Sequence, residues 1–224
     1  MAAGIPQIVA ETLGIRPDQV RVADPDTDIA AWDGGSQGGR TAQVVGLAAI
    51  QGAKELRAKA LKTAAQLLQV DAEYLDIVDG CICVHGETES RMALSEVATA
   101  ATFGGEPIQG NGGAALPAVP FNAGCANGLL FPFFTSPTYH VHYAEVEVNP
   151  VTGNVDVTRY VVAQDVGRVI NSACVAGQIQ GAVTQSIGYT LYESMRFAED
   201  GRIIEDNLQF YRLPLAVDIP KVEY

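Results

Sequence analysis

The first element that the hydrophobic pattern predicts is a short helix near the start of the chain. Apolar residues recur at helical spacing in IPQIVAETLG, and the pattern stops at Gly14. The next stretch, QVRVAD at positions 19–24, alternates apolar and polar residues as a half-buried strand does. The sequence therefore predicts a helix that leads into a strand.

A long amphipathic helix is predicted over residues 39–69. Its apolar residues recur every three or four positions, and its interior is rich in alanine, which permits close packing. The stretch WDGGSQGGRTAQVVG, residues 32–46, places two glycine pairs directly before this helix. So many residues without a side chain raise the question of what lies against the backbone there.

The segment LDIVDGCICVHG, residues 75–86, predicts a hairpin that turns at Asp79-Gly80, and a short helix follows near residues 94–101. Cys81, Cys83 and His85 share one face of the second strand, but one short face rarely supplies four metal ligands. We interpret them as packing residues. Between residues 104 and 134 the chain is rich in Gly, Pro, Ala and Asn, which indicates a functional or partner-covering loop.

The second half begins with two alternating runs joined at NPVTGN, residues 149–154, which predict a long antiparallel hairpin. His140 and His142 alternate on the first run and are interpreted as one face of that strand. A helix is then predicted from about Ala173. Three glycines interrupt it, each at a cost of about 1 kcal/mol relative to alanine. They indicate either tight helix-on-sheet packing or a ligand near the backbone, with neutral polar side chains at hand: Gln178, Gln180, Gln185 and Ser186.

Composition narrows the classes of protein. The 224 residues are 48% hydrophobic and 18% charged, which suits one large domain or two small ones. A net charge of -12 argues against nucleic acid and anionic membranes as partners. No apolar run is long enough to span a bilayer and no signal peptide is evident, so a cytoplasmic location is expected. The four cysteines are expected to be free and mostly buried.

Three segments resemble the molybdenum hydroxylases, the xanthine dehydrogenase and aldehyde oxidase family. Residues 23–49, ADPDTDIAAWDGGSQGGRTAQVVGLAA, are similar to that family's D-T-D and glycine-rich loop. Residues 144–193 are similar to its strand, D-V-G-x-x-I-N-P and G-Q-I-x-G-x-x-x-Q-G-I-G run. Residues 199–223 continue the likeness in order, so that it covers nearly the entire chain.

The resemblance implies a molybdopterin cofactor, in mononucleotide or dinucleotide form. In the family, the loop corresponding to Ser36 through Thr41 lies against the phosphate end of this cofactor, and Gln185 matches a glutamine placed beside the pterin. A helix N-terminus with glycines suits an anion, and a guanidinium adds charge-assisted donors. The alternative is a glycine turn that merely caps the long helix. The implied cofactor-binding residues are Gln37, Gly38, Gly39, Arg40, Thr41 and Gln185.

The family reaction is the hydroxylation of a heterocycle or aldehyde carbon with oxygen from water. Its base is a glutamate in a G-x-G-E segment, which is expected beyond Tyr224, so no catalytic residue or metal ligand is assigned within the chain. Glu106, in GGEP, looks similar, but it precedes the segments that the family motif follows. Iron-sulfur clusters and FAD are expected on partner domains or subunits, since no cysteine pattern for them is present.

The fold class implied is α+β: a mixed or antiparallel sheet with both long helices packed on it and their N-terminal ends converging on the cofactor. We expect residues 1–224 to form one molybdopterin-binding domain, incomplete at both ends, with sub-parts of roughly 1–130 and 131–224. The expected partners are the remaining half of the molybdenum subunit and iron-sulfur and flavin subunits, with self-association as a further option. The isolated chain is expected to be inactive.

Three readings stay open: a portion of a larger subunit, one polypeptide of a split enzyme, or a catalytically silent scaffold or interaction module. Three departures from the family pattern bear on this choice. Gly39 stands where a hydroxyl residue is common, Ser172 replaces a proline, and Ser186 replaces a glycine. None of them removes a charge that the cofactor site needs, which favours an enzyme component.

Overall fold

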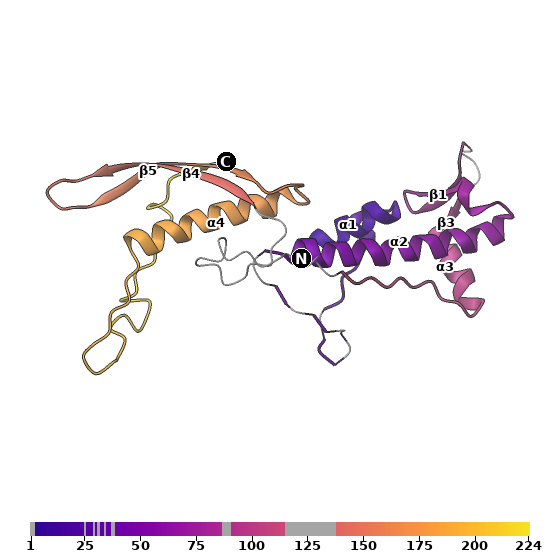
Figure 1. Cartoon of the computed structure of the whole chain (residues 1–224), viewed down its shortest axis with the longest axis horizontal. Helices are drawn as coiled ribbons and strands as arrows, with labels where there is room; N and C mark the ends of the chain where they lie inside the picture. Colours follow the sequence, from indigo (N-terminus) through magenta and orange to yellow (C-terminus); the bar gives the residue numbers. More distant parts are fainter. Residues whose placement is uncertain are drawn as a thin grey trace, which may run out of the picture. The chain divides into compact units, whose positions relative to one another are not determined.

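The structure is a computed structural model that describes residues 3–24, 26–28, 30, 32–33, 35–36, 39–86, 91–114 and 138–224. The chain divides into two units, Met1–Thr135 and Ser136–Tyr224, which are described separately (Figure 1). The described helices include none long and apolar enough to cross a membrane.

The first unit opens with helix α1, Gly4–Leu13, which ends at Gly14 in the left-handed conformation (φ 70°). A side chain at Gly14 would lie 2.9 Å from the carbonyl carbon of Ile77, so the position requires glycine. The predicted helix is therefore confirmed. The strand predicted for residues 19–24 is wrong: after the short helix η1, Pro17–Gln19, residues 20–24 have no regular structure, because no described strand pairs with them.

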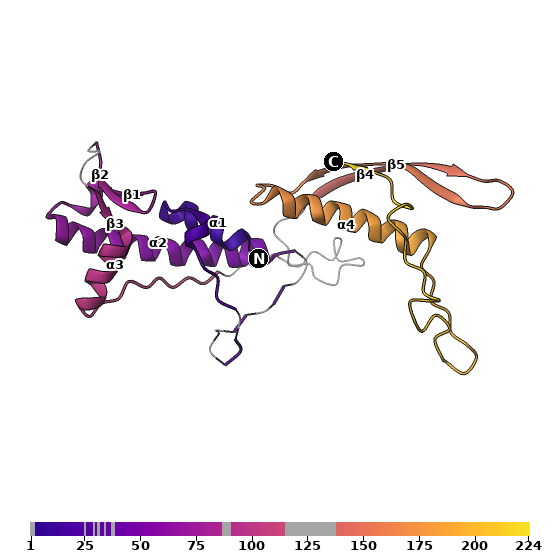
Figure 2. The same ribbon diagram turned by 180° about the vertical axis from the view of Figure 1, so that it is seen from behind.

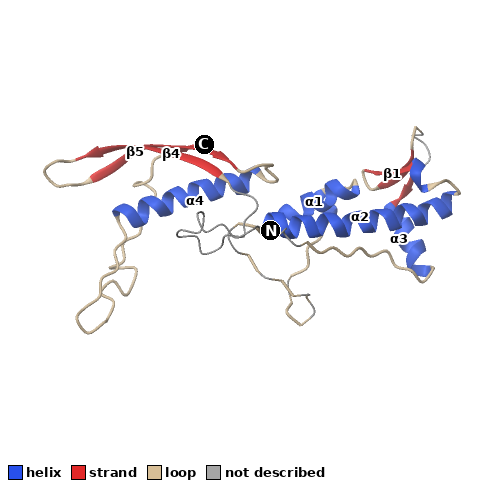
Figure 3. Ribbon diagram, viewed as in Figure 1, coloured by secondary structure: helices blue, strands red, loops and turns tan. Residues whose placement is uncertain are grey.

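Helix α2, Thr41–Leu68, confirms the long helix, and α1 lies along it (Figures 1 and 3). The short helix η2, Ala72–Tyr74, precedes an antiparallel sheet of β1, Leu75–Val78, β2, Cys81–Val84, and β3, Arg91–Ala93.

The hairpin between β1 and β2 turns where predicted. Asp79 and Gly80 both have positive φ, 50° and 77°, the conformation of a two-residue type I′ turn. Helix α3, Leu94–Phe103, begins where Glu96 accepts a hydrogen bond from the Ala93 amide, 3.0 Å away. The sheet, α2 and α3 share one core of seven buried residues: Ala60, Leu61, Ala64, Leu75, Ile77, Ile82 and Val97.

Residues 106–113 lie against α2, so the described part of the glycine-rich region serves packing within the unit. The Lys59 ammonium donates to the Gln109 carbonyl (2.8 Å), and the Asn111 amide donates to Glu55 (2.9 Å). Gly110 sits so close to α2 that a Cβ there would lie 2.9 Å from the Leu56 nitrogen. Residues 115–134, also predicted as a functional loop, fall outside the described residues.

The second unit is a hairpin backed by one helix (Figure 2). Strands β4, Tyr139–Val148, and β5, Val155–Asp165, are antiparallel, as predicted, and β6, Val222–Glu223, pairs parallel to β5. Helix α4, Ser172–Leu191, is capped by Asn171, whose side chain accepts from the Cys174 amide. Sheet and helix meet in a core of five residues: Val162, Ile179, Val183, Ile187 and Val222.

The α+β class is thus confirmed, with the described strands in two three-stranded sheets, one in each unit. Each sheet is accompanied by one of the two long helices, α2 in the first unit and α4 in the second.

Candidate functional site

The N-terminal end of α2 carries the first group of predicted site residues. Gly39 has a φ of 72°, and a Cβ built on it would meet nothing within 4 Å. The Thr41 hydroxyl is hydrogen-bonded to the Ser36 hydroxyl, 2.5 Å away, which ties the loop to the helix start. Gln37 and Gly38 lie outside the described residues. The described loop is therefore open on the side of Gly39.

Arg40 occupies the N-cap position of α2, and its side chain is half-buried. Its carbonyl accepts the amides of Gln43 and Val44, at 3.0 and 2.9 Å. No side chain caps this end, the first turn contains no acidic residue, and Arg40 makes no ion pair with a described carboxylate. The first turn of α2 therefore has backbone amides that no described side chain caps, and a helix N-terminus of this kind suits an anion.

Helix α4 carries the second group. Gln185 is exposed, and Gly177 and Gly181 precede it at four-residue intervals, which places the three along one face of the helix. Ile179 and Val183, on the other side of the helix, pack in the core with the sheet. The face that bears Gln185 therefore points away from the sheet.

The three glycines of α4 have different environments. A Cβ on Gly188 would lie 3.1 Å from the ring of Pro214 and closer still to the Glu193 carboxylate, so packing within the unit explains this glycine. A Cβ on Gly177 or Gly181 would meet nothing within 4 Å. Tight packing on the sheet therefore does not explain these two positions.

Gly39 through Thr41 belong to the first unit and Gln185 to the second. Each group is described within its own unit, so the convergence of the two helix ends on one cofactor stays a prediction.

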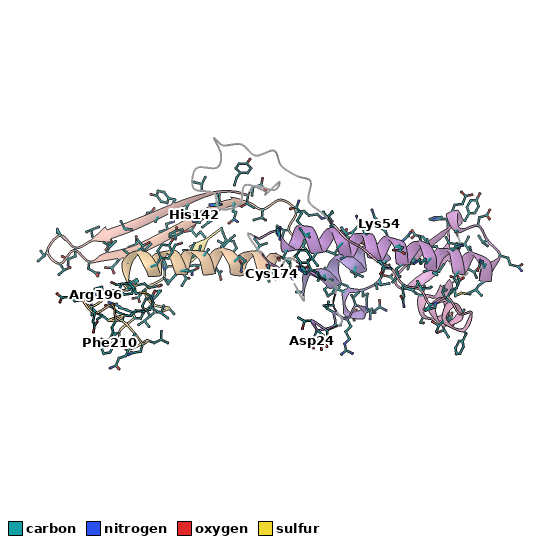
Figure 4. All side chains as sticks on the ribbon, turned by 60° about the horizontal axis from the view of Figure 1, so that its bottom comes forward. Asp24, Lys54, His142, Cys174, Arg196 and Phe210 are labelled. Atoms are coloured by element: carbon teal, nitrogen blue, oxygen red, sulfur yellow. The ribbon has the colours of Figure 1, made fainter. Side chains whose placement is uncertain are left out.

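The described residues include no group of three or more His, Cys, Asp or Glu side chains that could hold a metal ion. Cys81 and Cys83 are free and half-buried, whereas Cys174 is exposed in the first turn of α4 (Figure 4), so the expectation of a buried thiol is wrong there. Cys125 is not among the described residues. His140 and His142 lie on one strand face with their rings 5.2 Å apart, as predicted.

A groove of about 930 Å³ lies beside α4, where the helix faces the end of the chain. Gln180 and Thr184 line one wall, and the Gln180 amide donates to the Tyr224 hydroxyl at 3.3 Å. Gln185 is not among the lining residues. This groove and the face of α4 that carries Gln185 are separate features.

The ion pair between Arg196 and Glu205, called here the clasp, lies in the irregular segment after α4 and is not predicted by the sequence. The carboxylate of Glu205 is almost fully buried and accepts from the Arg196 amide (2.7 Å) and guanidinium (2.6 Å). These hydrogen bonds lower the pKa of Glu205, the backbone amide contributing most. Figure 4 labels Arg196, which lies in the irregular segment that follows α4. The positions are nine residues apart in an irregular segment, so no periodicity signals the pair.

Residues 2–220 match the family model described as the molybdopterin cofactor-binding domain. The chain belongs to this family. It is 33% identical over 218 residues to the gamma subunit of the 6-hydroxypseudooxynicotine dehydrogenase complex of Paenarthrobacter nicotinovorans, covering 97% of this chain and 26% of the relative. It is 30% identical over 221 residues to the carbon monoxide dehydrogenase large chain of Hydrogenophaga pseudoflava, with coverage of 97% and 26%.

Among solved structures, quinoline 2-oxidoreductase from Pseudomonas putida 86 aligns with a TM-score of 0.78 at 26% identity, covering 99% of this chain and 27% of that one. The chain thus spans about a quarter of the length of these relatives. The resemblance to the molybdenum hydroxylases is confirmed at the level of the family.

The described residues fit the cofactor of this family. Molybdopterin carries phosphate. The first turn of α2 contains no acidic residue and Arg40 stands at its N-cap, a combination that suits an anion. A flat heterocycle needs a surface without protruding side chains and a group that both donates and accepts hydrogen bonds. The face of α4 formed by Gly177, Gly181 and Gln185 has both properties.

Proposed function

We propose that this molybdopterin cofactor-binding domain is part of the large subunit of a molybdenum hydroxylase, and that residues 37–41 and Gln185 each bind the cofactor. The single observation that carries this assignment is the state of Arg40. It stands at a helix N-terminus that no side chain caps and whose first turn contains no acidic residue, in a family named for its cofactor.

Each proposed residue has a distinct task. The amides of the first turn of α2 and the Arg40 guanidinium bind the phosphate end, while Gly39 lets that end approach the backbone. The Gln185 amide orients the pterin by donating and accepting hydrogen bonds. When bound, the cofactor supplies the oxidation that hydroxylates a heterocycle or aldehyde carbon with oxygen taken from water.

The general base is proposed to lie outside residues 1–224, so these residues alone are expected to be inactive. Glu106, whose GGEP segment has a similar look, lies on the tract of residues 106–113 along α2, where it lines a small hollow with Pro107, Ile108 and Lys62. That tract belongs to the packing of the first unit. The base, the substrate pocket and the electron acceptors are assigned to the rest of the subunit and to iron-sulfur and flavin partners.

The relatives support a multisubunit setting, because they are named as a complex subunit gamma and as a large chain. Their names also span chemically different substrates, a nicotine derivative and carbon monoxide. We therefore propose only the reaction class, the hydroxylation of a heterocycle or aldehyde, and leave the individual substrate open. We also propose a location in the cytoplasm.

The test is molybdenum and pterin per chain in the protein isolated from its own cells with the chains that co-elute. Arg40→Ala is compared with Arg21→Ala, which removes an exposed arginine of the same unit, and Gln185→Ala with Gln66→Ala, which removes an exposed glutamine of α2. Loss of the charge-assisted contact in Arg40→Ala weakens cofactor binding by about 10-fold to 100-fold, and loss of the neutral amide contact in Gln185→Ala weakens it by about 2-fold to 10-fold. Both site variants are therefore expected to lose molybdenum.

The controls are expected to keep their molybdenum. No molybdenum in the unmodified protein with its companion chains intact would favour the scaffold reading and turn the glycine loop into a helix cap. Full molybdenum content in both Arg40→Ala and Gln185→Ala would refute the assignment of these residues.

A further inference from the structure

Within the part of the chain that the structure describes, one edge of strand β4 pairs with no other strand. The order of its sheet is β4-β5-β6, and β5 is the one described strand that pairs with β4. All ten residues of β4 are exposed, including Tyr139 (69%), Val141 (70%) and Tyr143 (56%). The amide and carbonyl groups along such an edge form a template for another strand.

The usual protections of an edge strand are absent from its first half. Residues 139–148, YHVHYAEVEV, contain no proline, lysine or glycine. The irregularity in pairing with β5 falls between Glu145 and Val146, and the two acidic residues of the strand, Glu145 and Glu147, lie in the same half. Residues 139–144 therefore form a regular, formally uncharged stretch that is open to pairing.

This stretch is self-complementary. The sequence YHVHY at positions 139–143 reads the same in both directions. In an antiparallel pair of two such strands centred on Val141, Tyr139 of one copy lies opposite Tyr143 of the other, and the two Val141 residues lie opposite each other. Residues of the same parity point to the same face, so every pair in this register matches across a continuous sheet.

The two faces of the pairing are distinct. His142 lies opposite Val162 of β5, a core residue beneath which α4 packs, so the histidines point toward the helix side. The tyrosines and Val141 point to the opposite face, which α4 leaves uncovered. Aromatic and β-branched residues directly opposite each other are the pairs that stabilise antiparallel sheets best.

We propose that β4 of this chain pairs with β4 of a second copy, centred on Val141, to join two sheets into one. In this register Glu145 and Glu147 lie beyond the palindrome, and the carboxylates of the two copies do not oppose one another. Charge thus permits the pairing although the chain carries a net charge of -12.

The test is the mass of the 224-residue chain by sedimentation equilibrium over a range of micromolar concentrations. The unmodified chain is expected to be dimeric. Val141→Lys sets two lysines opposite each other and is expected to weaken the dimer by about tenfold or more. Val151→Lys is the matched control, because Val151 is 92% exposed in the turn of the same hairpin and lies outside the pairing. Circular dichroism checks that both variants keep their fold.

A second measurement fixes the register. Opposite residues of an antiparallel pair have Cα atoms about 4.5–5.5 Å apart, which is within disulfide range. Val141→Cys is therefore expected to form a covalent dimer on mild oxidation, at a level above both the unmodified chain and Val151→Cys. A monomeric unmodified chain, or a Val141→Lys variant that dimerises as tightly as the control, would overturn the proposal.

Discussion

The contact of the glycine-rich tract with α2 gives a quantitative prediction about stability. Gly110→Ala places a methyl group 2.9 Å from the Leu56 nitrogen and closer still to the Gly52 carbonyl oxygen. Gly112→Ala places one 2.6 Å from the Gly52 nitrogen and closer still to the Ala48 carbonyl oxygen. All of these neighbours are backbone atoms of a helix, so they cannot rotate away as a side chain would.

The cost follows from two ways of accommodating the methyl group. If α2 and the tract separate slightly, the strain is that of an overpacked site, about 1–3 kcal/mol. If the tract lifts away, it loses the hydrogen bonds from Lys59 to Gln109 and from Asn111 to Glu55. Solvent screens the charged partner in each of these exposed bonds, so each is worth about 0.5–1.5 kcal/mol. Both routes predict a destabilisation of about 1–3 kcal/mol.

Urea denaturation followed by far-ultraviolet circular dichroism measures this change in the free energy of unfolding. Gly113→Ala is the matched control, because a Cβ there meets nothing within 4 Å, and it is expected to stay within about 0.5 kcal/mol of the unmodified chain. Equal midpoints for Gly110→Ala and Gly113→Ala would refute the close packing of the tract on α2.

Two further predictions concern the second unit. Gly177→Ala and Gly181→Ala are each expected to raise stability by about 1 kcal/mol in thermal unfolding, because a Cβ at either position meets nothing within 4 Å. Gly188→Ala is expected to lower stability, because its Cβ would meet the ring of Pro214. A lower stability of Gly177→Ala would contradict the open face. The folded state lowers the pKa of Glu205, so the stabilisation is present above the carboxyl group's ordinary pKa and is lost as the pH falls through the lowered value. The melting temperature of Glu205→Gln is therefore expected to fall below that of the unmodified chain at pH 7 and to approach it in acid, and a difference independent of pH would contradict the clasp.

Elements fixed by local chemistry could be predicted from the sequence. The hairpin at Asp79-Gly80 needs two residues with positive φ, and few pairs of residues adopt this conformation as readily. Helix α1 ends at Gly14 for a similar reason, and the alternation of β4 and β5 around an Asn-Pro turn leaves little choice of register. In each case the information lies within a few residues.

Features that depend on distant partners could not be predicted in this way. Residues 20–24 alternate as a strand does, but a strand exists only if another pairs with it, and none does among the described residues. The glycines at 110 and 112 suggested a functional loop, yet they are required by the backbone of α2 some sixty positions earlier. The periodicity of a segment does not indicate which distant segment packs against it.

The glycines of α4 show how a structural and a functional cause can be separated. Glu193 and Pro214 leave no room for a side chain at position 188, so packing alone explains this glycine and no ligand has to be invoked. Gly177 and Gly181 gain nothing from the described structure and cost about 1 kcal/mol each in helix stability. If the cofactor lies against this face beside Gln185, alanine at either position is expected to stabilise the chain and to lower its molybdenum content. Opposite signs in these two measurements cannot arise from packing alone, since a residue that matters only for packing changes stability and cofactor content together.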